Sequence, residues 1–340
     1  MKEKKNVILC DFKTPNPWHF QEGLNSVSGS KWGRIELVNN SKKGKFANIK
    51  RYFKYFSFSF KIFIHRNKYH NIIAWQQFYG LLFAFFCRFF HVKKKNNLFI
   101  MIFIYIPKKG IAGSFYYHFM HFILSSKYID RIFLFSSSEI NRYLKELKLK
   151  NNKFVFMPFG SDVLNQNFAI DFKPNFIFSS GYSNRDYNFL IDALYHEKYV
   201  VRIYGSKNFL DNNIIMKDEF VGDKLSAILN KAHLVVLPLK ENRESGQFTL
   251  IHAMQAGIPV IATDTDCMKD YIINGFNGFT IPNDTKLWLE KINLLYSDET
   301  LYSKMSANCK KIYKEKFTET ALGKNIGESI NDLLKENQHD

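Results

Sequence analysis

The sequence predicts an α/β protein of two domains, each built around a parallel β-sheet. Short apolar runs alternate with amphipathic stretches along the whole chain, which is typical of parallel α/β domains. The 340 residues suffice for two such domains with separate cores. Charge divides the chain as well: residues 1–160 carry 28 Lys and Arg against 7 Asp and Glu, and residues 161–340 carry 20 against 24. We therefore expect a strongly basic domain over 1–160, a near-neutral domain over 161–320, and a final helix over 321–340 that could cross back to the first domain.

The first half contains six apolar runs of strand length, with four amphipathic stretches between them. The serines before residue 139 supply an N-cap for the last of the helices. The expected strands are 6–10, 34–38, 72–75, 98–105, 131–135 and 153–157, and the expected helices are 19–28, 77–90, 114–125 and 138–147. A stretch rich in Phe and Lys, residues 42–68, is expected to be a mobile or membrane-proximal insertion.

The second half repeats this rhythm after a polar, irregular segment over 161–174, where we place the domain boundary. The expected strands are 176–179, 200–204, a short one near 219–221, 234–237 and 259–262. The expected helices are 187–194, 224–230, 246–255, 287–296, 299–314 and 319–336.

The composition excludes several classes of protein. The four cysteines are scattered, without a zinc-ligand spacing, and are expected to be free buried thiols in a reducing cytosol. The apolar run at the N-terminus is too short for a signal peptide. The most apolar segment, 78–92, contains Arg88 and is shorter than the roughly 20 residues needed to span a bilayer. We therefore expect a cytoplasmic protein.

The charge of the first half points to an anionic partner: a membrane leaflet, a lipid phosphate or a nucleic acid. The plain alternative is a solvated basic surface in a Lys-rich proteome. No helix-turn-helix, zinc-finger or RNP pattern supports a nucleic acid.

The segment 234–282 carries the densest chemical signal. A buried strand leads into a polar loop, and Gly246 then opens an apolar-faced helix. Loops that join the carboxyl end of a parallel strand to a helix bind ligands in α/β proteins. The amides of Gly246, Gln247, Phe248 and Thr249 are predicted to point at an anion, and a diphosphate fits such a site.

This segment resembles the nucleotide-sugar-binding region of family 4 of the retaining GT-B glycosyltransferases. Glu244 matches the first Glu of the family's Glu-x7-Glu pattern, and residues 253–260 (AMQAGIPV) match its tail. His252 stands where the family has the second Glu. The resemblance implies that Glu244 contacts the donor sugar and that His252 lies at the ribose, whose hydroxyls it could still bind.

Two further blocks match the same family. Residues 176–193 resemble its first donor-domain strand, with Gly181 after the strand and Arg185 where a basic residue clamps the donor diphosphate. The alternative for Arg185 is a helix-start arginine paired with Asp186. Residues 154–162 resemble the interdomain element. Asp264-Thr265-Asp266 has the spelling of a metal motif, but we interpret it as a turn or helix start.

The resemblance implies a GT-B fold, two Rossmann-like domains facing across a cleft, and a hexosyltransferase that needs no metal or other cofactor. Its donor would be a UDP- or GDP-sugar, and its acceptor a glycan or lipid-linked molecule in cell-surface polysaccharide or lipopolysaccharide assembly. The enzyme would be peripheral on an anionic membrane, with no nucleic acid as partner. Ser245 joins the predicted donor site, and His19, Lys108 and Lys109 are candidate acceptor-side residues. The alternatives are a basic nucleic-acid-binding protein and a GT-B sugar-nucleotide epimerase.

Overall fold

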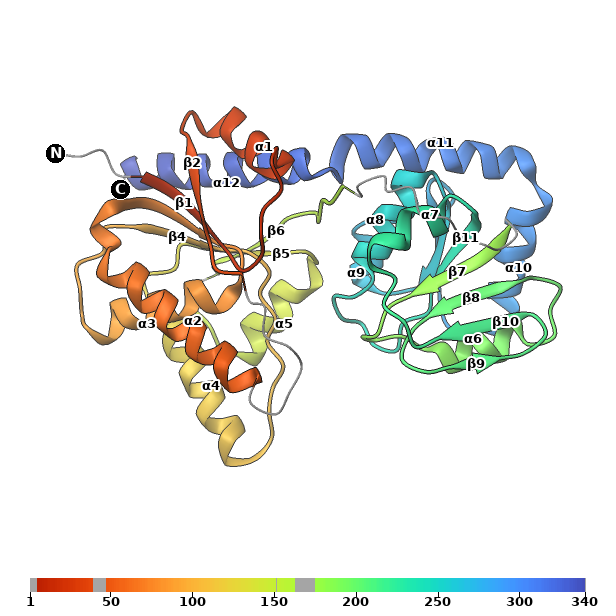
Figure 1. The fold of residues 1–340 in the computed structure, drawn as a ribbon, viewed down its shortest axis with the longest axis horizontal. Coiled ribbons are helices and arrows are strands. Elements are labelled where there is room, and N and C mark those ends of the chain that lie inside the picture. The colour runs from red at the N-terminus through yellow and green to blue at the C-terminus, as the bar shows by residue number, and fades with distance from the viewer. Residues whose placement is uncertain (1–4, 39–46, 151, 163–174, 340) are drawn as a thin grey trace. The chain divides into compact units, whose positions relative to one another are not determined.

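The chain divides into two compact units, Met1–Met157 with Gly323–Asp340 and Pro158–Leu322. The structure is a computed structural model that describes residues 5–38, 47–150, 152–162 and 175–339 (Figure 1). The sequence places the boundary at 160/161, and the structure divides the chain three residues earlier. Most of the polar segment over 161–174 lies outside the described residues.

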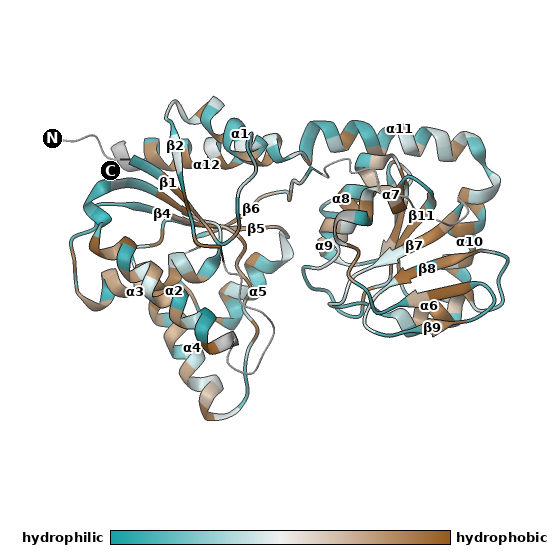
Figure 2. Ribbon diagram, in the orientation of Figure 1, coloured by the Kyte–Doolittle hydropathy of each residue, from teal (hydrophilic) through white to brown (hydrophobic). Residues whose placement is uncertain are grey.

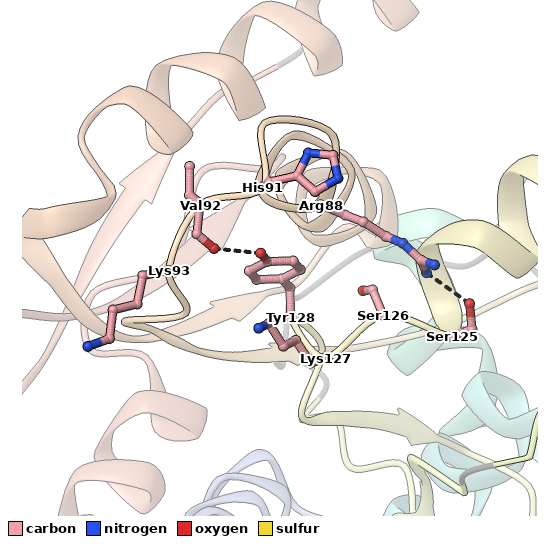
Figure 3. A pocket seen from close by; sticks show the side chains of 8 residues that line it. All are labelled: Arg88, His91, Val92, Lys93, Ser125, Ser126, Lys127 and Tyr128. Atoms are coloured by element: carbon pink, nitrogen blue, oxygen red, sulfur yellow. Dashed lines mark hydrogen bonds between the residues drawn. The ribbon is translucent and has the colours of Figure 1, made fainter.

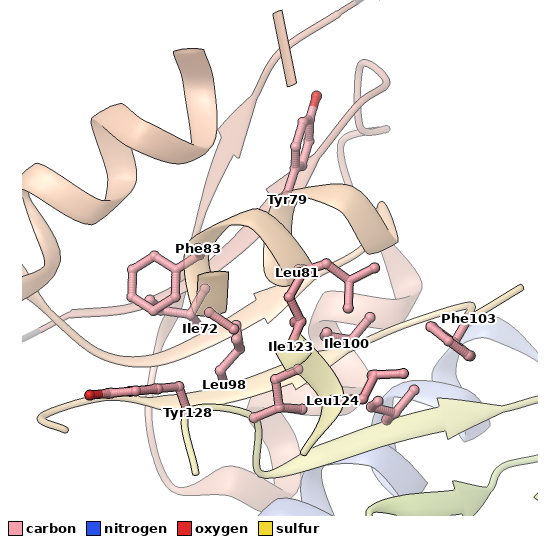
Figure 4. Close-up of a cluster of buried hydrophobic side chains, with 14 of the residues drawn as sticks. Ile72, Tyr79, Leu81, Phe83, Leu98, Ile100, Phe103, Ile123, Leu124 and Tyr128 are labelled. Carbon is pink, nitrogen blue, oxygen red and sulfur yellow. The ribbon is translucent and has the colours of Figure 1, made fainter. Parts of the chain in front are cut away.

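Unit 1 is a parallel sheet of six strands in the order β2-β1-β3-β4-β5-β6. Buried aliphatic side chains of the strands meet those of α3 and α4, as Figure 4 shows for Ile72, Leu98 and Ile123. The strands are β1 (Lys5–Cys10), β2 (Trp32–Glu36), β3 (Tyr69–Ala74), β4 (Asn97–Ile100), β5 (Arg131–Leu134) and β6 (Phe154–Phe156); the helices are α1 (His19–Ser28), α2 (Ala47–Ile64), a 3-10 turn (Arg66–Lys68), α3 (Gln77–Phe89), α4 (Gly110–Leu124) and α5 (Ser138–Glu146).

In unit 1 one strand is shorter than expected, and the described part of segment 42–68 forms a helix. The strand expected over 98–105 ends at Ile100, because Ile102 adopts a left-handed φ of 51° that breaks the extended backbone. The segment expected to be an insertion forms α2 over its described part. Tyr55, Ile62 and Phe63 recur at helical spacing on one side of α2 and are buried. Ring contacts such as Phe63 with Phe90 fix α2 to the end of α3.

The last helix, α12 (Glu319–His339), joins unit 1 from Gly323 onward. Gly323 and Gly327 let it approach α1 closely: a Cβ on Gly323 would lie 2.0 Å from the carbonyl oxygen of Phe20. Asn331 donates to the carbonyl of Val27 (2.8 Å), which fixes the next turn of α12. A chain segment far from the N-terminus thus completes the first unit.

Unit 2 is a sheet of seven strands in the order β13-β12-β11-β7-β8-β10-β9, parallel except for the edge strand β9. Helices cover both of its faces, and the strands are the hydrophobic centre (Figure 2). The strands are β7 (Phe176–Ser180), β8 (Val201–Tyr204), β9 (Phe209–Leu210), β10 (Ile214–Lys217), β11 (Ala232–Leu237), β12 (Val260–Thr263) and β13 (Gly278–Ile281); the helices are α6 (Tyr187–Leu194), a 3-10 turn (Gly222–Lys224), α7 (Leu225–Leu229), α8 (Gln247–Ala256), α9 (Asp266–Lys269), α10 (Thr285–Ser297) and α11 (Glu299–Lys316).

The order of the strands in unit 2 reverses at β7. The chain runs from β7 outward through β8 to β10, and then returns to place β11 on the other side of β7. The connections that follow β7 and β11 therefore run in opposite directions from the carboxyl ends of these two strands. Such a point in an open sheet is where ligands bind.

The predicted position of one strand of unit 2 was wrong. The strand expected near 219–221 is instead β10, five residues earlier, and residues 219–221 form a loop before a 3-10 turn. Gly278–Ile281 and the short Phe209–Leu210 were not predicted as strands. Asp264-Thr265-Asp266 is a helix start, as expected, because the Thr265 hydroxyl accepts a hydrogen bond from the amide of Met268.

Candidate functional site

A cavity opens at the carboxyl ends of β7 and β11, within unit 2 alone. Two loops form its polar side, one over 181–186 and one over 238–246. Asn184 joins them: its amide nitrogen donates to the carbonyl of Glu241 (2.9 Å), and its side-chain oxygen accepts from the amide of Glu241 (3.0 Å). The left-handed φ of Asn184, 55°, suits an Asn in a tight turn.

The cavity has a volume of about 340 Å³ and two chemically different sides. Residues from the two loops and from the start of α8 make the polar side, and residues that follow β8 and β10 make the more apolar side. Its lining is Ser180, Gly181, Tyr182, Ser183, Arg185, Tyr204, Glu219, Phe220, Val221, Gly222, Leu225, Ser245, Gly246, Phe248 and Thr249.

Arg185 lies between the two loops and is only 9% exposed. Its Nε donates to the carbonyl of Ser180 (3.0 Å), and its Nη1 donates to the Ser245 hydroxyl (2.8 Å). Gly181, at a left-handed φ of 127°, leaves room for the guanidinium, since a Cβ there would lie 2.7 Å from Nη2. A Cβ on Gly246 would lie 3.6 Å from the same nitrogen. The guanidinium is thus held beside both glycines.

The charge of Arg185 has no carboxylate partner within 4.0 Å among the residues the structure describes. Asp186, the expected alternative partner, instead caps α6 by accepting from the amide of Phe189 (3.2 Å). Burial lowers the pKa of Arg185, although a guanidinium keeps its proton at neutral pH. A buried cation held only by neutral oxygens is costly, and an anion in the cavity would offset that cost.

Helix α8 begins at the same place. Gly246 precedes it with a left-handed φ of 96°, and no side chain of the described residues caps the first turn. Thr249 lines the cavity, and its hydroxyl lies 3.0 Å from that of Ser180. The amino end of a helix carries partial positive charge. Arg185 and the α8 terminus therefore present positive charge to one cavity.

The remaining predicted donor-side residues of unit 2 do not line the cavity. The Gln247 side chain is buried and donates to Cys267 Sγ (2.9 Å). Glu244 is half-buried and lies near enough to Tyr271 to raise the pKa of that phenol further, after the larger effect of burial. Of the loop and helix positions predicted from sequence, Ser245, Gly246, Phe248 and Thr249 line the cavity with Arg185 and Gly181.

His252 is 2% exposed and lies beneath Phe248, with ring centroids 4.1 Å apart. Its Nε2 lies 3.2 Å from the Ser161 hydroxyl, and its Nδ1 has no hydrogen-bond partner among the described residues. Burial lowers the pKa of His252 to about 3, against a smaller opposing effect of Asp162. His252 could therefore reach a ribose in the cavity only if Phe248 or Ser161 moved.

The three acceptor-side candidates lie in unit 1. His19 is the exposed first residue of α1. Lys108 lies with its Nζ 4.8 Å from the ring centre of Tyr116, and Lys109 is the exposed residue before α4.

Sequence reasoning missed the apolar side of the cavity. Tyr204, Phe220 and Val221 line it, together with Glu219, Gly222 and Leu225. This loop was not predicted because a strand was expected near 219–221. A strand placed at Ile214–Lys217 would have put residues 218–222 at the carboxyl end of the sheet, beside the predicted anion site.

The sequence of unit 2 matches a known family. Residues 169–312 match the family described as Glycosyl transferases group 1. That match lies wholly within unit 2. The match covers the cavity and both of the loops around it, and it includes no residue of unit 1.

Similar proteins support the same enzyme class. The capsular polysaccharide biosynthesis glycosyltransferase CapM of Staphylococcus aureus is 24% identical over an alignment of 262 residues, and the match covers 65% of this chain and 68% of CapM. Anabaena HepE in complex with UDP has a TM-score of 0.65 at 13% identity and covers 96% of this chain and 100% of its own. Sucrose-phosphate synthase of Thermosynechococcus elongatus has a TM-score of 0.71 at 12% identity and covers 98% and 100%.

The chain is therefore a nucleotide-sugar-dependent glycosyltransferase with the GT-B fold. The predicted fold class and enzyme class are confirmed, and the alternatives of a nucleic-acid-binding protein and an epimerase are not favoured. In this glycosyltransferase the region that matches the group 1 family contains the cavity beside Arg185, so that cavity is its candidate donor site.

Proposed function

We propose that this glycosyltransferase binds the diphosphate of a UDP- or GDP-sugar between Arg185 and the amino end of α8. It would transfer the sugar, with retention, to a glycan or lipid-linked acceptor in capsular polysaccharide or lipopolysaccharide assembly. One observation carries the proposal: the buried Arg185 has neutral oxygens but no described carboxylate around it, and it faces an uncapped helix start.

The second side of the cavity suits a nucleobase. Phe220 is 76% exposed although it lines the cavity, and Tyr204 and Val221 lie on the same side. An aromatic ring that remains exposed in an unliganded site gains buried area when a flat base stacks on it. A diphosphate on the polar side and a base on this side account for both halves of the lining.

The chemistry would follow from charge. The acceptor hydroxyl would attack the anomeric carbon from the face on which the diphosphate leaves. As the new bond forms, the bond from that carbon to the diphosphate oxygen breaks, its electron pair leaves with the nucleotide, and the hydroxyl proton passes to the departing oxygen. Arg185 and the first amides of α8 would stabilise the charge on that oxygen. A guanidinium in this place supplies the charge that a metal ion supplies in other transferases, so we expect activity without a divalent metal. Glu244 would contact the donor sugar, by resemblance to family 4.

The membrane part of the proposal rests on three neighbouring helices of unit 1. Exposed apolar residues recur at helical spacing along α2, at the end of α3 and along α4. This aromatic face consists of Ile49, Phe53, Phe56, Phe60, Ile64, Phe89, Phe90, Ile111, Phe115 and Phe122. Ring contacts of Phe60 with Phe86 and of Phe85 with Phe119 show that α2 packs on α3 and α3 on α4.

A large exposed apolar surface marks an interface. Not one of the described helices has the length and apolarity to cross a bilayer. We therefore infer that the aromatic face rests on the cytoplasmic leaflet and brings unit 1 to a lipid-linked acceptor.

A thermal-shift panel of UDP, GDP and their sugars tests the donor site. We expect one nucleotide to stabilise the wild type and Phe220→Ala to lose most of that shift. Leu210→Ala is the matched control, because Leu210 is an exposed apolar residue of the same unit outside the cavity. Arg185→Lys, which keeps a cation, should lose more of the shift than Leu210→Ala does. Equal shifts in all four proteins would contradict the proposed site.

A further inference from the structure

A second cavity lies in unit 1, at the carboxyl ends of α3 and α4, far along the chain from the donor site. It has a volume of about 520 Å³ and is lined by eight residues: Arg88, His91, Val92, Lys93, Ser125, Ser126, Lys127 and Tyr128. Figure 3 shows Arg88 reaching Ser125 and Tyr128 reaching the carbonyl of Val92. We call these eight residues the basic pocket.

The basic pocket is held together by hydrogen bonds between its two sides. Arg88 Nη1 donates to the carbonyl of Phe122 and to the Ser125 hydroxyl (2.9 Å), which ties the last turn of α3 to that of α4. The Tyr128 hydroxyl donates to the carbonyl of Val92 (2.5 Å). These hydrogen bonds join the two chain segments that carry the cations of the pocket.

The basic pocket carries more positive charge than the carboxyl ends of α3 and α4 neutralise. Arg88 is accounted for by its bonds at the end of α4, as cations commonly are at helix carboxyl ends. Lys93 and Lys127 are both exposed and have no ion pair with a described residue. None of the eight lining residues is acidic. Asp130, two residues after Tyr128 in the sequence, is already bound by Lys94 (2.6 Å) and by the amide of Leu98 (2.9 Å).

Ser126 is an independent sign of a ligand. It is 4% exposed, and its hydroxyl has no hydrogen-bond partner among the residues described, although it lines the cavity. A buried polar group without a partner costs free energy, and native proteins keep few of them. Beneath it, Lys153 donates to the carbonyl of Ser126. Burial lowers the pKa of Lys153 to about 8 against an opposing effect of Asp130, and the nearby cations Lys94 and Arg88 lower it further.

We propose that the basic pocket binds the headgroup phosphate of an anionic phospholipid, with Lys93, Lys127 and the Ser126 hydroxyl as its ligands. A free phosphate would have the same chemistry, but the neighbours of the pocket favour a lipid. Phe89 and Phe90 follow Arg88 and are exposed, and the Arg88 guanidinium lies 4.1 Å from the ring centre of Phe122. All three rings belong to the aromatic face, so a phosphate here would have acyl chains beside it.

The sequence around the pocket supports an anionic partner. From Leu37 to Ile129 the chain contains 16 Lys and Arg and not one Asp or Glu. This segment includes α2, α3 and α4. Each Lys or Arg near an anionic leaflet strengthens membrane binding roughly fivefold. The inference deepens the membrane docking proposed above and rests on it.

Co-sedimentation of the full chain with vesicles tests the pocket. Lys93→Gln/Lys127→Gln should bind vesicles of phosphatidylcholine with phosphatidylglycerol at least roughly tenfold more weakly than the wild type. Lys31→Gln/Lys145→Gln removes the same charge from exposed positions outside the pocket and should lose about threefold at most. An equal loss in the two double variants would overturn the proposal.

Ser126→Ala separates binding from folding. If the hydroxyl awaits a phosphate, its removal should leave the thermal midpoint of the free protein unchanged or raised, and should weaken binding to the anionic vesicles by about threefold. A lowered midpoint with unchanged vesicle binding would make Ser126 a structural residue and would overturn its role.

Soluble ligands distinguish the sources of phosphate. Glycerol phosphate should bind the wild type far more weakly than the vesicles do. If instead it stabilises the wild type but not Lys93→Gln/Lys127→Gln, while both bind vesicles equally, the site takes a free phosphate and the lipid proposal fails. A single-stranded oligonucleotide that displaces the wild type from vesicles through Lys93 and Lys127 would also overturn it. The nucleotide thermal shift of unit 2 should persist in all these variants, and its absence from the wild type would contradict the donor site alone.

Discussion

His252 shows how one residue can couple the candidate site to pH. It stands where the resemblance places a carboxylate at the ribose, yet it lies beneath Phe248 and bonds Ser161. The position is the same in the sequence pattern, but burial excludes a charged side chain there. The pattern located the residue correctly on α8, and only packing could tell that its imidazole stays neutral.

The pKa of His252, lowered to about 3 from 6.5, predicts acid sensitivity. Between these values the unfolded chain binds a proton that the folded chain does not, so stability is full above pH 6.5 and falls as the pH drops toward 3. At pH 5 the loss should be about 2 kcal/mol. Urea unfolding at pH 8 and pH 5 should show this difference in the wild type and a smaller one in His252→Gln.

The exposed His196 provides the control for that experiment. Its left-handed φ of 59° suits an Asn, so His196→Asn should keep both the fold and the full pH dependence of the wild type. If His252→Gln and His196→Asn lose equal stability on acidification, then His252 is not the group that titrates.

At the scale of the element, local patterns predicted some helices to the residue and failed on others. The apolar spacing of α1 and α6 fixed their bounds, because each buries one face against its own sheet. α2 was missed because its aromatic residues occupy both faces: Tyr55 and Phe63 are buried and Phe53 and Phe56 are exposed. An exposed apolar stripe removes the polar face that marks a helix in sequence.

The close approach of α12 to α1 was also beyond the sequence analysis, although Gly323 and Gly327 stand four residues apart. Their meaning depends on which helix they meet. Of the candidate site, the loop glycines and Arg185 followed from motif and spacing. The Phe220 side did not, because it depends on where β10 ends.

Gly323→Ala should destabilise unit 1. Alanine favours a helix by about 1 kcal/mol over glycine, but its Cβ would lie 2.0 Å from the Phe20 carbonyl oxygen and 2.8 Å from the Leu24 nitrogen. Both are backbone atoms of α1, so the helices must separate, at a cost of about 1–3 kcal/mol. We expect a lower urea midpoint than in Lys324→Ala, an exposed substitution one residue later. A stabilised Gly323→Ala would show that α12 does not pack against α1.

At the scale of the whole molecule, the uneven charge separates two tasks. Residues 1–160 hold the aromatic face and the excess of cations, while 161–340 hold the donor cavity and a small excess of carboxylates. An extended cationic surface acts over long range and is screened by salt. A buried guanidinium in a small cavity is screened much less. Ionic strength should therefore weaken membrane binding by the first region more than nucleotide binding by the second.

Raising the salt concentration should weaken binding to phosphatidylglycerol vesicles steeply but change the nucleotide thermal shift little, because the Debye length falls from about 10 Å at 0.1 M to about 3 Å at 1 M. The binding that survives high salt should come from the aromatic face. Phe53→Ser/Phe115→Ser removes two of its most exposed rings and should abolish most of that remainder, since each inserted Phe contributes about 1.5–3 kcal/mol. Leu210→Ser/Ile273→Ser makes a similar change on unit 2 and should not. Vesicle binding that salt removes completely, and that the phenylalanine variant leaves unaltered, would reduce the contact to charge alone and leave the aromatic face without a membrane role.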